Sequence, residues 1–158
     1  MSSAIEVCVD ASVAVKVVVA ESDSDRADAL FSEWIRDGKG LIAPAFFEVE
    51  VDSILRQKTV LRRELTVEQS DSAFVELLML PIQQMSLPGQ RRRAWELAGH
   101  FALPTVYDAT YLALADLRGC EFWTADERLF RRVENRLTFV RWLGNYPVVP
   151  LDRPVLER

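Results

Sequence analysis

The chain has 158 residues, of which 49% are apolar and 27% charged, and its formal net charge is −5. This composition is typical of a soluble globular protein and excludes an intrinsically disordered chain. The length favours a single domain, residues 1–158, with a hydrophobic core of its own. The apolar runs are too short to cross a bilayer, and no basic segment precedes the first of them as in a signal peptide. We therefore expect a cytoplasmic protein with no membrane segment.

The cysteines and the single histidine limit the possible chemistry. Cys8 and Cys120 fall in apolar segments without the spacing of metal ligands, so we expect two reduced thiols. His100 is the only histidine, and no serine or cysteine forms a nucleophile–base pattern with it. A catalytic hypothesis for this chain therefore rests on carboxylates.

Charge is distributed unevenly along the chain. Residues 1–54 contain 11 acids and 4 bases, a net charge of −7, whereas residues 80–158 contain 9 acids and 11 bases, a net charge of +2. Arginines cluster at 91–93 and again at 128, 131, 132 and 136. An acidic site beside arginine patches suits a phosphate-bearing polymer, although solvated helix faces explain either cluster taken alone equally well.

The first third of the chain alternates strands and helices. Residues 5–9 are β-branched and apolar, which predicts a strand that ends at Asp10, and Ser12 is suited to cap a helix through residues 13–19. A helix over 26–36 and a short strand over 41–43 follow. Pro44 then suits the first turn of a helix over 44–58. The strand ending in Asp10 places this carboxylate at the C-terminal edge of the predicted sheet.

The helix predicted over 44–58 contains three acids on different faces. Helical spacing puts Glu50 on the face of Phe46 and Phe47, among apolar side chains, and puts Glu48 and Asp52 on a face that we expect to be solvated. Glu50 is therefore the stronger candidate for a functional role.

The rest of the chain continues the alternation. We predict helices over 66–79, with Thr66 and Gln69 forming a capping box, over 89–101, over 107–118 and after Asp126, the last carrying Arg128, Arg131 and Arg132. Strands are predicted over 80–85, 122–123 and 137–142, before an irregular tail with Pro147, Pro150 and Pro154. The pattern is typical of an α/β fold with a mainly parallel central sheet flanked by helices.

Two further acids stand where stability alone would not place them. Asp108 lies in the first turn of the helix over 107–118, on the same face as Tyr111, Leu112 and Ala115, and that helix ends at Gly119. A carboxylate on an apolar face must be hydrated, paired or bound to a metal. Asp126 follows a strand end, where open α/β sheets collect their ligands.

Asp10, Glu50, Asp108 and Asp126 therefore form a candidate site at one edge of the sheet. Four carboxylates close together repel one another unless a cation or protons neutralise them. Oxygen ligands without histidine or cysteine favour Mg²⁺, or Mn²⁺, over zinc. Such an ion can activate water and stabilise the charge on a phosphoryl oxygen.

The motifs around these acids resemble those of PIN-domain ribonucleases, in particular the VapC-type toxins of toxin–antitoxin pairs. The four motifs are Val9-Asp10-Ala11-Ser12, Pro44 followed by Glu50-Val51-Asp52-Ser53, the segment from Tyr107 to Ala115, and Thr124-Ala125-Asp126 with Leu129. Ser53 stands where the family usually has asparagine. The similarity covers roughly residues 5–142, and the last two motifs together are specific.

The resemblance implies a PIN-like fold and a Mg²⁺-dependent endoribonuclease. It also implies a homodimer that is inhibited by a cognate antitoxin, which inserts a peptide near the acidic pocket. Asp10 and Asp108 would be the principal metal ligands, Glu50 and Asp126 would complete the pocket, and Ser12 and Thr124 would be hydroxyl partners behind the ligands.

Other conspicuous residues have plainer interpretations. Asp116 lies near the end of the helix of Asp108 but on another face. We interpret Lys16 as a surface lysine rather than part of the pocket mouth. Trp34, Trp95, Trp123 and Trp142 are expected in the core rather than as platforms for bases.

Several other functions remain open at this point. A phosphatase or mutase with a nucleophilic aspartate usually has Asp-x-Asp where this chain has Asp10-Ala11-Ser12. A structure-specific DNA nuclease on the same scaffold would need longer insertions. An RNA-processing nuclease without an antitoxin and a catalytically silent PIN-like binding module are the remaining alternatives, and the presence of all four acids counts against the last.

Overall fold

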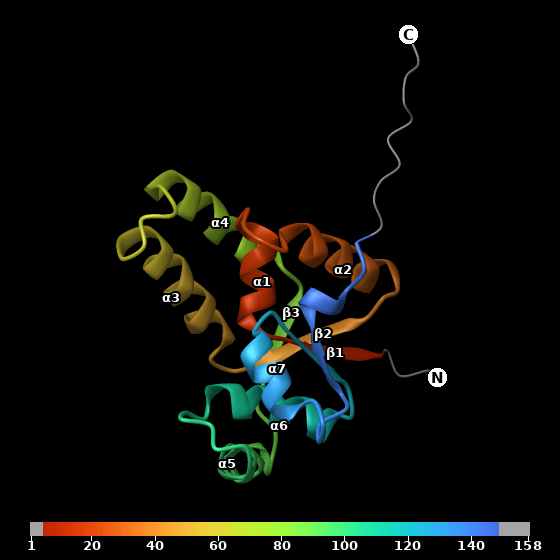
Figure 1. The fold of residues 1–158 in the computed structure, drawn as a ribbon. Helices are drawn as coiled ribbons and strands as arrows, with labels where there is room; N and C mark the ends of the chain where they lie inside the picture. The colour runs from red at the N-terminus through yellow and green to blue at the C-terminus, as the bar shows by residue number, and fades with distance from the viewer. Residues whose placement is uncertain (1–4, 149–158) are drawn as a thin grey trace.

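The computed structural model describes residues 5–148, in which five parallel strands form one sheet with helices on both faces (Figure 1). The strands are β1 (Glu6–Val9), β2 (Gly40–Pro44), β3 (Ile82–Met85), β4 (Glu121–Thr124) and β5 (Val140–Trp142). The helices are α1 (Ala11–Val18), α2 (Ser24–Arg36), α3 (Phe47–Val60), α4 (Val67–Met79), α5 (Gln90–His100), α6 (Tyr107–Arg118), α7 (Glu127–Val133) and the short 3-10 helix η1 (Leu143–Asn145). The predicted α/β class with a mainly parallel sheet is confirmed.

Two predictions reach beyond this part of the chain. A single domain over residues 1–158 stays a prediction, and Pro150 and Pro154 of the expected irregular tail lie outside the described residues. Among the helices of residues 5–148, none has the length and apolar character needed to cross a membrane.

The strand order is β3-β2-β1-β4-β5, and every neighbouring pair is parallel. The chain lays down β1, β2 and β3 in one direction and then returns to the other side of β1 for β4 and β5. The winding direction therefore reverses between β1 and β4, where Cys8 pairs with Phe122 and Val9 with Trp123. In open α/β sheets, ligands bind outside the carboxyl ends of the strands at such a reversal.

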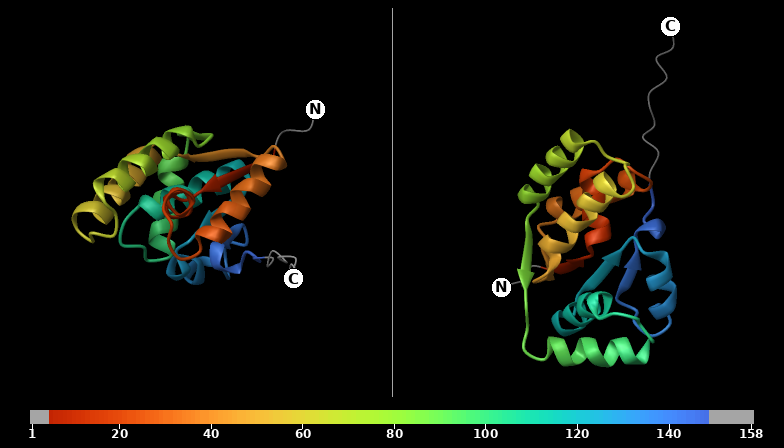
Figure 2. Two further views of the ribbon diagram at one scale, coloured as in Figure 1. Left: turned by 90° about the horizontal axis from the view of Figure 1, so that it is seen from above. Right: turned by 90° about the vertical axis from the view of Figure 1, so that its left-hand side faces the viewer.

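Alternating side chains of the strands supply two separate cores. Val7, Val9 and Leu41 pack with Trp34 of α2 on one face of the sheet. The other face, including Cys8 and Phe122, packs beneath α6 and the helices around it. Figure 2 shows the α3–α4 hairpin and α5 at opposite ends of the molecule.

Helix α6 is the central element of the second core. It contacts β1, β2 and β4, and α5 packs on its outer side. Its residues from Tyr111 to Ala115 are all 0% exposed, because a helix that is apolar on every side belongs inside the fold. Gly119 ends the helix with a φ of 65°, as predicted. Because the middle of α6 is packed in the core, Asp108 in its first turn is held in a fixed position.

Several local predictions can be compared with the structure. The capping box of Thr66 and Gln69 is confirmed at the start of α4. Pro44 does not begin α3, which starts at Phe47; it is the last residue of β2 and pairs with Met85. Ser12 does not cap α1, because its hydroxyl donates to Asp10 instead.

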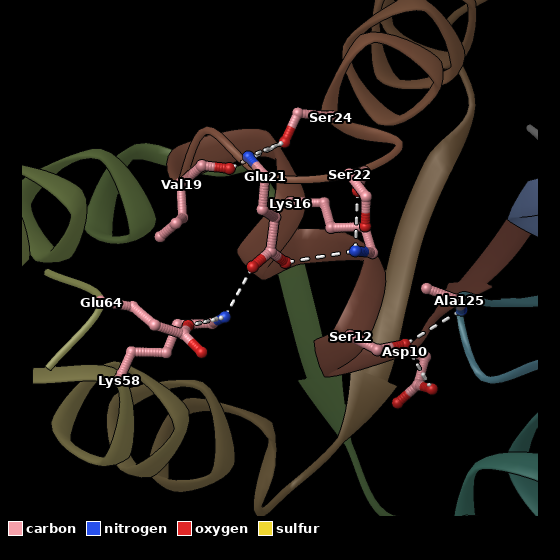
Figure 3. Close-up of polar contacts among 10 residues, drawn as sticks. All are labelled: Asp10, Ser12, Lys16, Val19, Glu21, Ser22, Ser24, Lys58, Glu64 and Ala125. Atoms are coloured by element: carbon pink, nitrogen blue, oxygen red, sulfur yellow. Dashed lines mark hydrogen bonds and ion pairs between the residues drawn. The ribbon is translucent and has the colours of Figure 1, made fainter. Parts of the chain in front are cut away.

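Lys16 lies away from the acidic site, as predicted, but it is not a free surface lysine. Its side chain is 15% exposed, and its ammonium bonds Glu21 Oε1 at 3.2 Å and the Ser22 carbonyl at 2.8 Å (Figure 3). Glu21 in turn pairs with Lys58, which also pairs with Glu64. This network joins the C-terminal ends of α1 and α3, away from the ends that carry Asp10 and Glu50.

The tryptophans differ from one another. Trp34 is 1% exposed, as predicted for a core residue, and Trp123 and Trp142 are partly buried. Trp95 is 74% exposed, so its assignment to the core was wrong. Helix α5 turns Ala94, Leu97 and Ala98 inward, and at about 100° per residue Trp95 points away from them.

Candidate active site

Asp10 follows β1 directly and is the most buried acid of the site, with 5% of its surface exposed. Its Oδ2 accepts hydrogen bonds from Ser12 Oγ at 2.8 Å and from Thr124 Oγ1 at 2.7 Å. Within residues 5–148 no side chain donates to Oδ1, and no fully buried side-chain oxygen in that range lacks a partner. Oδ1 is therefore the atom that remains accessible to a ligand.

The two hydroxyls connect Asp10 to the turn between β4 and α7. Ser12 Oγ accepts from the Ala125 N–H at 3.0 Å, and Thr124 Oγ1 accepts from the Asp126 N–H at 3.0 Å. Figure 3 shows Ser12 between Asp10 and Ala125. Each hydroxyl thus accepts a hydrogen bond from a backbone N–H of the turn and donates one to the buried carboxylate. Burial raises the pKa of Asp10, and these hydrogen bonds oppose the rise by stabilising the charged form.

Glu50 lies in the first turn of α3 and is partly buried, whereas Glu48 is exposed, as the helical spacing predicted. The Tyr111 hydroxyl donates to Glu50 Oε1 at 3.2 Å. Burial, followed by repulsion from Asp10 and Asp108, raises the pKa of Glu50 from 4.5 to about 7, against the opposing effect of the Tyr111 hydrogen bond.

Asp108 stands in the first turn of α6, where the helix dipole favours a charged carboxylate. Desolvation and repulsion from Asp10 and Asp126 outweigh that effect and raise the pKa of Asp108 from 3.8 to about 6. Asp126 is more exposed and caps α7, with its Oδ1 accepting from the Leu129 N–H at 3.1 Å. Its second oxygen is free to face the site.

The structure therefore brings the four predicted acids into one electrostatic unit. Asp10 acts on Glu50 and Asp108, and Asp126 acts on Asp10 and Asp108. They come from four segments that surround the carboxyl ends of β1 and β4. However, no group of three or more Asp, Glu, His or Cys side chains in residues 5–148 is arranged to hold a metal ion together. That all four acids bind metal stays a prediction.

A cavity of about 240 Å³ opens beside Asp108 and Asp126, and Arg128 and Arg132 line it as well. Arg132 donates to the Ala102 carbonyl at 3.2 Å, which holds its guanidinium at the cavity. Part of the second arginine cluster thus lies next to the acids. Asp116, by contrast, pairs with Arg93 at 2.7 Å and lies outside the site, as its position on the helix indicated.

Sequence reasoning missed the polar role of Tyr111. Spacing placed it on the face of Asp108 as an apolar neighbour, and its ring is indeed 0% exposed and stacked on Phe122. Its hydroxyl reaches Glu50 from another helix, a contact 61 residues apart in the chain. The available signal was that a buried tyrosine hydroxyl needs a partner. Ser53 is exposed on α3 and is not among the residues that bond the four acids.

Comparisons with known proteins agree with this architecture. The family model of the PIN domain matches residues 7–136. Ribonuclease VapC12 of Mycobacterium tuberculosis is 32% identical over 123 residues, which are 78% of this chain and 88% of that protein. Ribonuclease VapC3 of the same organism is 34% identical over 128 residues, 80% of this chain and 86% of that protein. The solved structure of PAE2754 from Pyrobaculum aerophilum superposes with a TM-score of 0.58 at 20% identity, covering 87% of this chain and 96% of that one, and supports the fold.

The fold and the acidic edge define a PIN-type α/β protein. The chain belongs to the PIN-domain family, and the two relatives above are VapC ribonucleases. The resemblance carried by the four sequence motifs is thus confirmed.

Replacing Thr124 tests the hydroxyl connection to Asp10. Thr124→Val keeps the shape of a 0% exposed side chain but removes the donor to Asp10 and the acceptor for the Asp126 N–H. We expect the free energy of unfolding to fall by about 1–3 kcal/mol. The loss should be larger at a high pH, where Asp10 is charged, than at a low pH, because the lost hydrogen bond stabilised the charged carboxylate. Urea unfolding at both pH values measures this.

The control is Thr59→Val, which removes a hydroxyl bonded to a helix carbonyl and should show no such pH dependence. An equal loss at both pH values for Thr124→Val would contradict the connection.

The raised pKa of Glu50 predicts how the metal-free protein responds to pH. Folded Glu50 holds its proton up to about pH 7, whereas the unfolded side chain loses it near 4.5. The folded state therefore binds more protons in this window, and stability should decrease as the pH rises through it. Unfolding in EDTA should show the decrease in the wild type and less of it in Glu50→Gln. Glu48→Gln is the matched control on the exposed face, and an equal effect of both changes would refute the assignment.

Proposed function

We propose that this protein is a metal-dependent endoribonuclease, the toxin component of a VapC-type toxin–antitoxin pair. The observation that carries the proposal is the meeting of four carboxylates from four segments at the strand-order reversal, with the pKa of at least three of them raised. Such an arrangement costs stability unless a cation or a proton compensates it, which is typical of a site kept for function. The VapC ribonucleases among the relatives support RNA as the substrate.

The donor set fits a hard divalent cation, for which we propose Mg²⁺ with Mn²⁺ as a substitute. Every candidate ligand is a carboxylate, and Asp10 lies close enough to Asp108 to raise its pKa. Mg²⁺ commonly binds through one or two carboxylates, with water and substrate phosphate completing its shell. We assign Asp10 and Asp108 as these ligands, with Glu50 and Asp126 completing the site. When bound, the ion would stabilise negative charge on the phosphoryl group.

Glu50 is the residue that we assign to the attacking water. It is not one of the two principal metal ligands, and a carboxylate in this position can accept a proton from water. Tyr111 occupies Oε1, which leaves Oε2 to take a proton from the water as its oxygen bonds to phosphorus. The P–O bond to the leaving oxygen breaks, and that oxygen takes a proton from solvent. Ser12 and Thr124 hold Asp10 in place and do not meet the substrate. Arg128 and Arg132, in the cavity beside Asp108, would hold a phosphate oxygen.

We further propose a cognate antitoxin and a homodimer, and activity in the cytoplasm, where the RNA substrate is found. The support for protein partners is that large apolar side chains are exposed along the α3–α4 hairpin. These are Val60, Leu61, Val67, Val75, Leu78 and Met79. Exposed apolar surface of this kind often marks a contact with another chain. The acidic site would also attract a basic segment of an antitoxin, which could pair with these carboxylates.

Cleavage assays test the catalytic proposal. The purified protein should cleave RNA with Mg²⁺ or Mn²⁺ and stop when EDTA is added. Glu50→Gln should lower the rate by about 100-fold or more, the usual contribution of a positioned acid or base, while Glu48→Gln stays close to wild type. Gel analysis of labelled RNA gives both rates. Cleavage that persists in EDTA, or equal losses in the two glutamate variants, would refute the mechanism.

A second assay tests inhibition through the site. Co-expression with the product of the adjacent reading frame should yield a complex that no longer cleaves RNA. Asp108→Asn should weaken this complex, because one carboxylate is lost to the basic segment, and more salt should weaken the wild-type complex too. Calorimetry compares the two affinities. Unchanged binding by variants of all four acids would show that inhibition does not depend on this site.

A further inference from the structure

A second cavity, of about 830 Å³, is lined by Tyr107, the neighbour of Asp108, which lines the arginine-lined cavity of the site. Its walls come from α5 and the residues before it, from the first turn of α6 and from Phe46 ahead of α3. Aromatic and basic side chains line it: Phe46, Arg91, Arg92, Trp95 and Tyr107. None of these residues has a role in the site described above.

This aromatic cavity is connected to the acids through a row of rings. The Phe46 ring centroid lies 5.5 Å from that of Tyr107 and 5.6 Å from that of Tyr111, edge to face in both cases. Tyr111 donates to Glu50, and Tyr107 immediately precedes Asp108. The cavity therefore lies one residue along the chain from Asp108 and one ring contact from Tyr111, the partner of Glu50.

Two of the rings are exposed to an extent that the core does not explain. Trp95 is 74% exposed and Tyr107 is 58% exposed. Large aromatic side chains gain little for folding when they face solvent. They do offer flat surfaces on which nucleic-acid bases stack, and each such stack strengthens binding by about 5- to 150-fold.

The arginines beside these rings differ in their partners. Arg93 pairs with Asp116 at 2.7 Å and with Glu96 at 3.7 Å, so its charge is already neutralised. Arg91 and Arg92 line the cavity and make no ion pair with any side chain of residues 5–148. Two uncompensated guanidinium groups next to exposed rings match the alternating phosphates and bases of a nucleic-acid strand.

We propose that the aromatic cavity binds a single-stranded segment of the RNA adjacent to the phosphate that is cleaved. Bases stack on Trp95 and Tyr107, and Arg91 and Arg92 contact the phosphates that link them. A single strand is required because bases paired in a duplex do not expose their faces. This inference rests on the proposed ribonuclease function and adds a subsite to it.

Charge favours RNA over a second copy of this chain as the occupant. A two-fold contact centred on this cavity would place Arg91 and Arg92 against the same residues of the partner copy. Such like charges repel, whereas a phosphate backbone attracts them.

The test is the binding of a short fluorescein-labelled single-stranded RNA, followed by fluorescence anisotropy in EDTA over a range of salt concentrations. Trp95→Ala should weaken binding about fivefold or more without changing its salt dependence, and Trp95→Phe should restore most of the affinity. Arg91→Gln and Arg92→Gln should each weaken binding and make the slope of log K against log salt less negative by about 0.7. The matched controls are Phe74→Ala and Arg62→Gln, which change exposed residues outside the cavity. Both variants should bind RNA as tightly as the wild type does.

Three other results would contradict the RNA subsite or the proposed function. If the wild type binds no RNA, or if Trp95→Ala and the two arginine variants bind as tightly as the wild type, the subsite does not exist, even where Mg²⁺-dependent cleavage is intact. Cavity-dependent binding without any cleavage in Mg²⁺ would refute the proposed function and leave the binding inference standing. Sedimentation of the same samples detects the competing occupant. If Trp95→Ala turns a dimer into a monomer of unchanged RNA affinity, the cavity is an interface between copies and the proposal is wrong.

Discussion

The burial of one carboxylate, Asp10, between two neighbouring strand ends is the constraint on which the rest of this site depends. A bare charge there would cost too much to keep, so Ser12 and Thr124 both donate to a single oxygen. The same hydroxyls accept the N–H groups of Ala125 and Asp126. The end of β1 and the turn after β4 therefore hold each other in position, and one oxygen of Asp10 is left for a ligand.

The remaining acids add repulsion, which makes the charged site less favourable for folding. Glu50 and Asp108 reach the same edge from the first turns of α3 and α6, and repulsion adds to desolvation in raising the pKa of both. Two other partly buried acids pair with bases instead. Glu21 is bonded by Lys16 and Lys58, and Asp116 by Arg93. Acids paired with bases stabilise the fold, whereas the crowded acids of the site destabilise it when they are charged.

Basic and aromatic groups lie next to this acidic edge. Arg128 and Arg132 lie in the cavity beside Asp108 and Asp126, and the exposed rings of Trp95 and Tyr107 line the aromatic cavity. The net negative charge of the chain therefore does not describe the surface around the site. Guanidinium groups next to the carboxylates favour the approach of a polyanion.

The sequence by itself determined the α/β class, the capping box of α4, the end of α6 at Gly119 and the inward position of Glu50. These follow from local periodicity and from backbone preferences, which act over a few residues. Only the tertiary structure decided that Ser12 bonds Asp10 instead of capping α1, that Lys16 joins an ion-pair network, that the Tyr111 hydroxyl meets Glu50 and that Trp95 faces solvent. Each of these depends on which element packs against which. Ser12 also accepts from the Ala125 N–H, Lys58 reaches Glu21 from α3, and Tyr111 reaches Glu50 across 61 residues, so partners distant in the chain decide these positions and no local pattern encodes them.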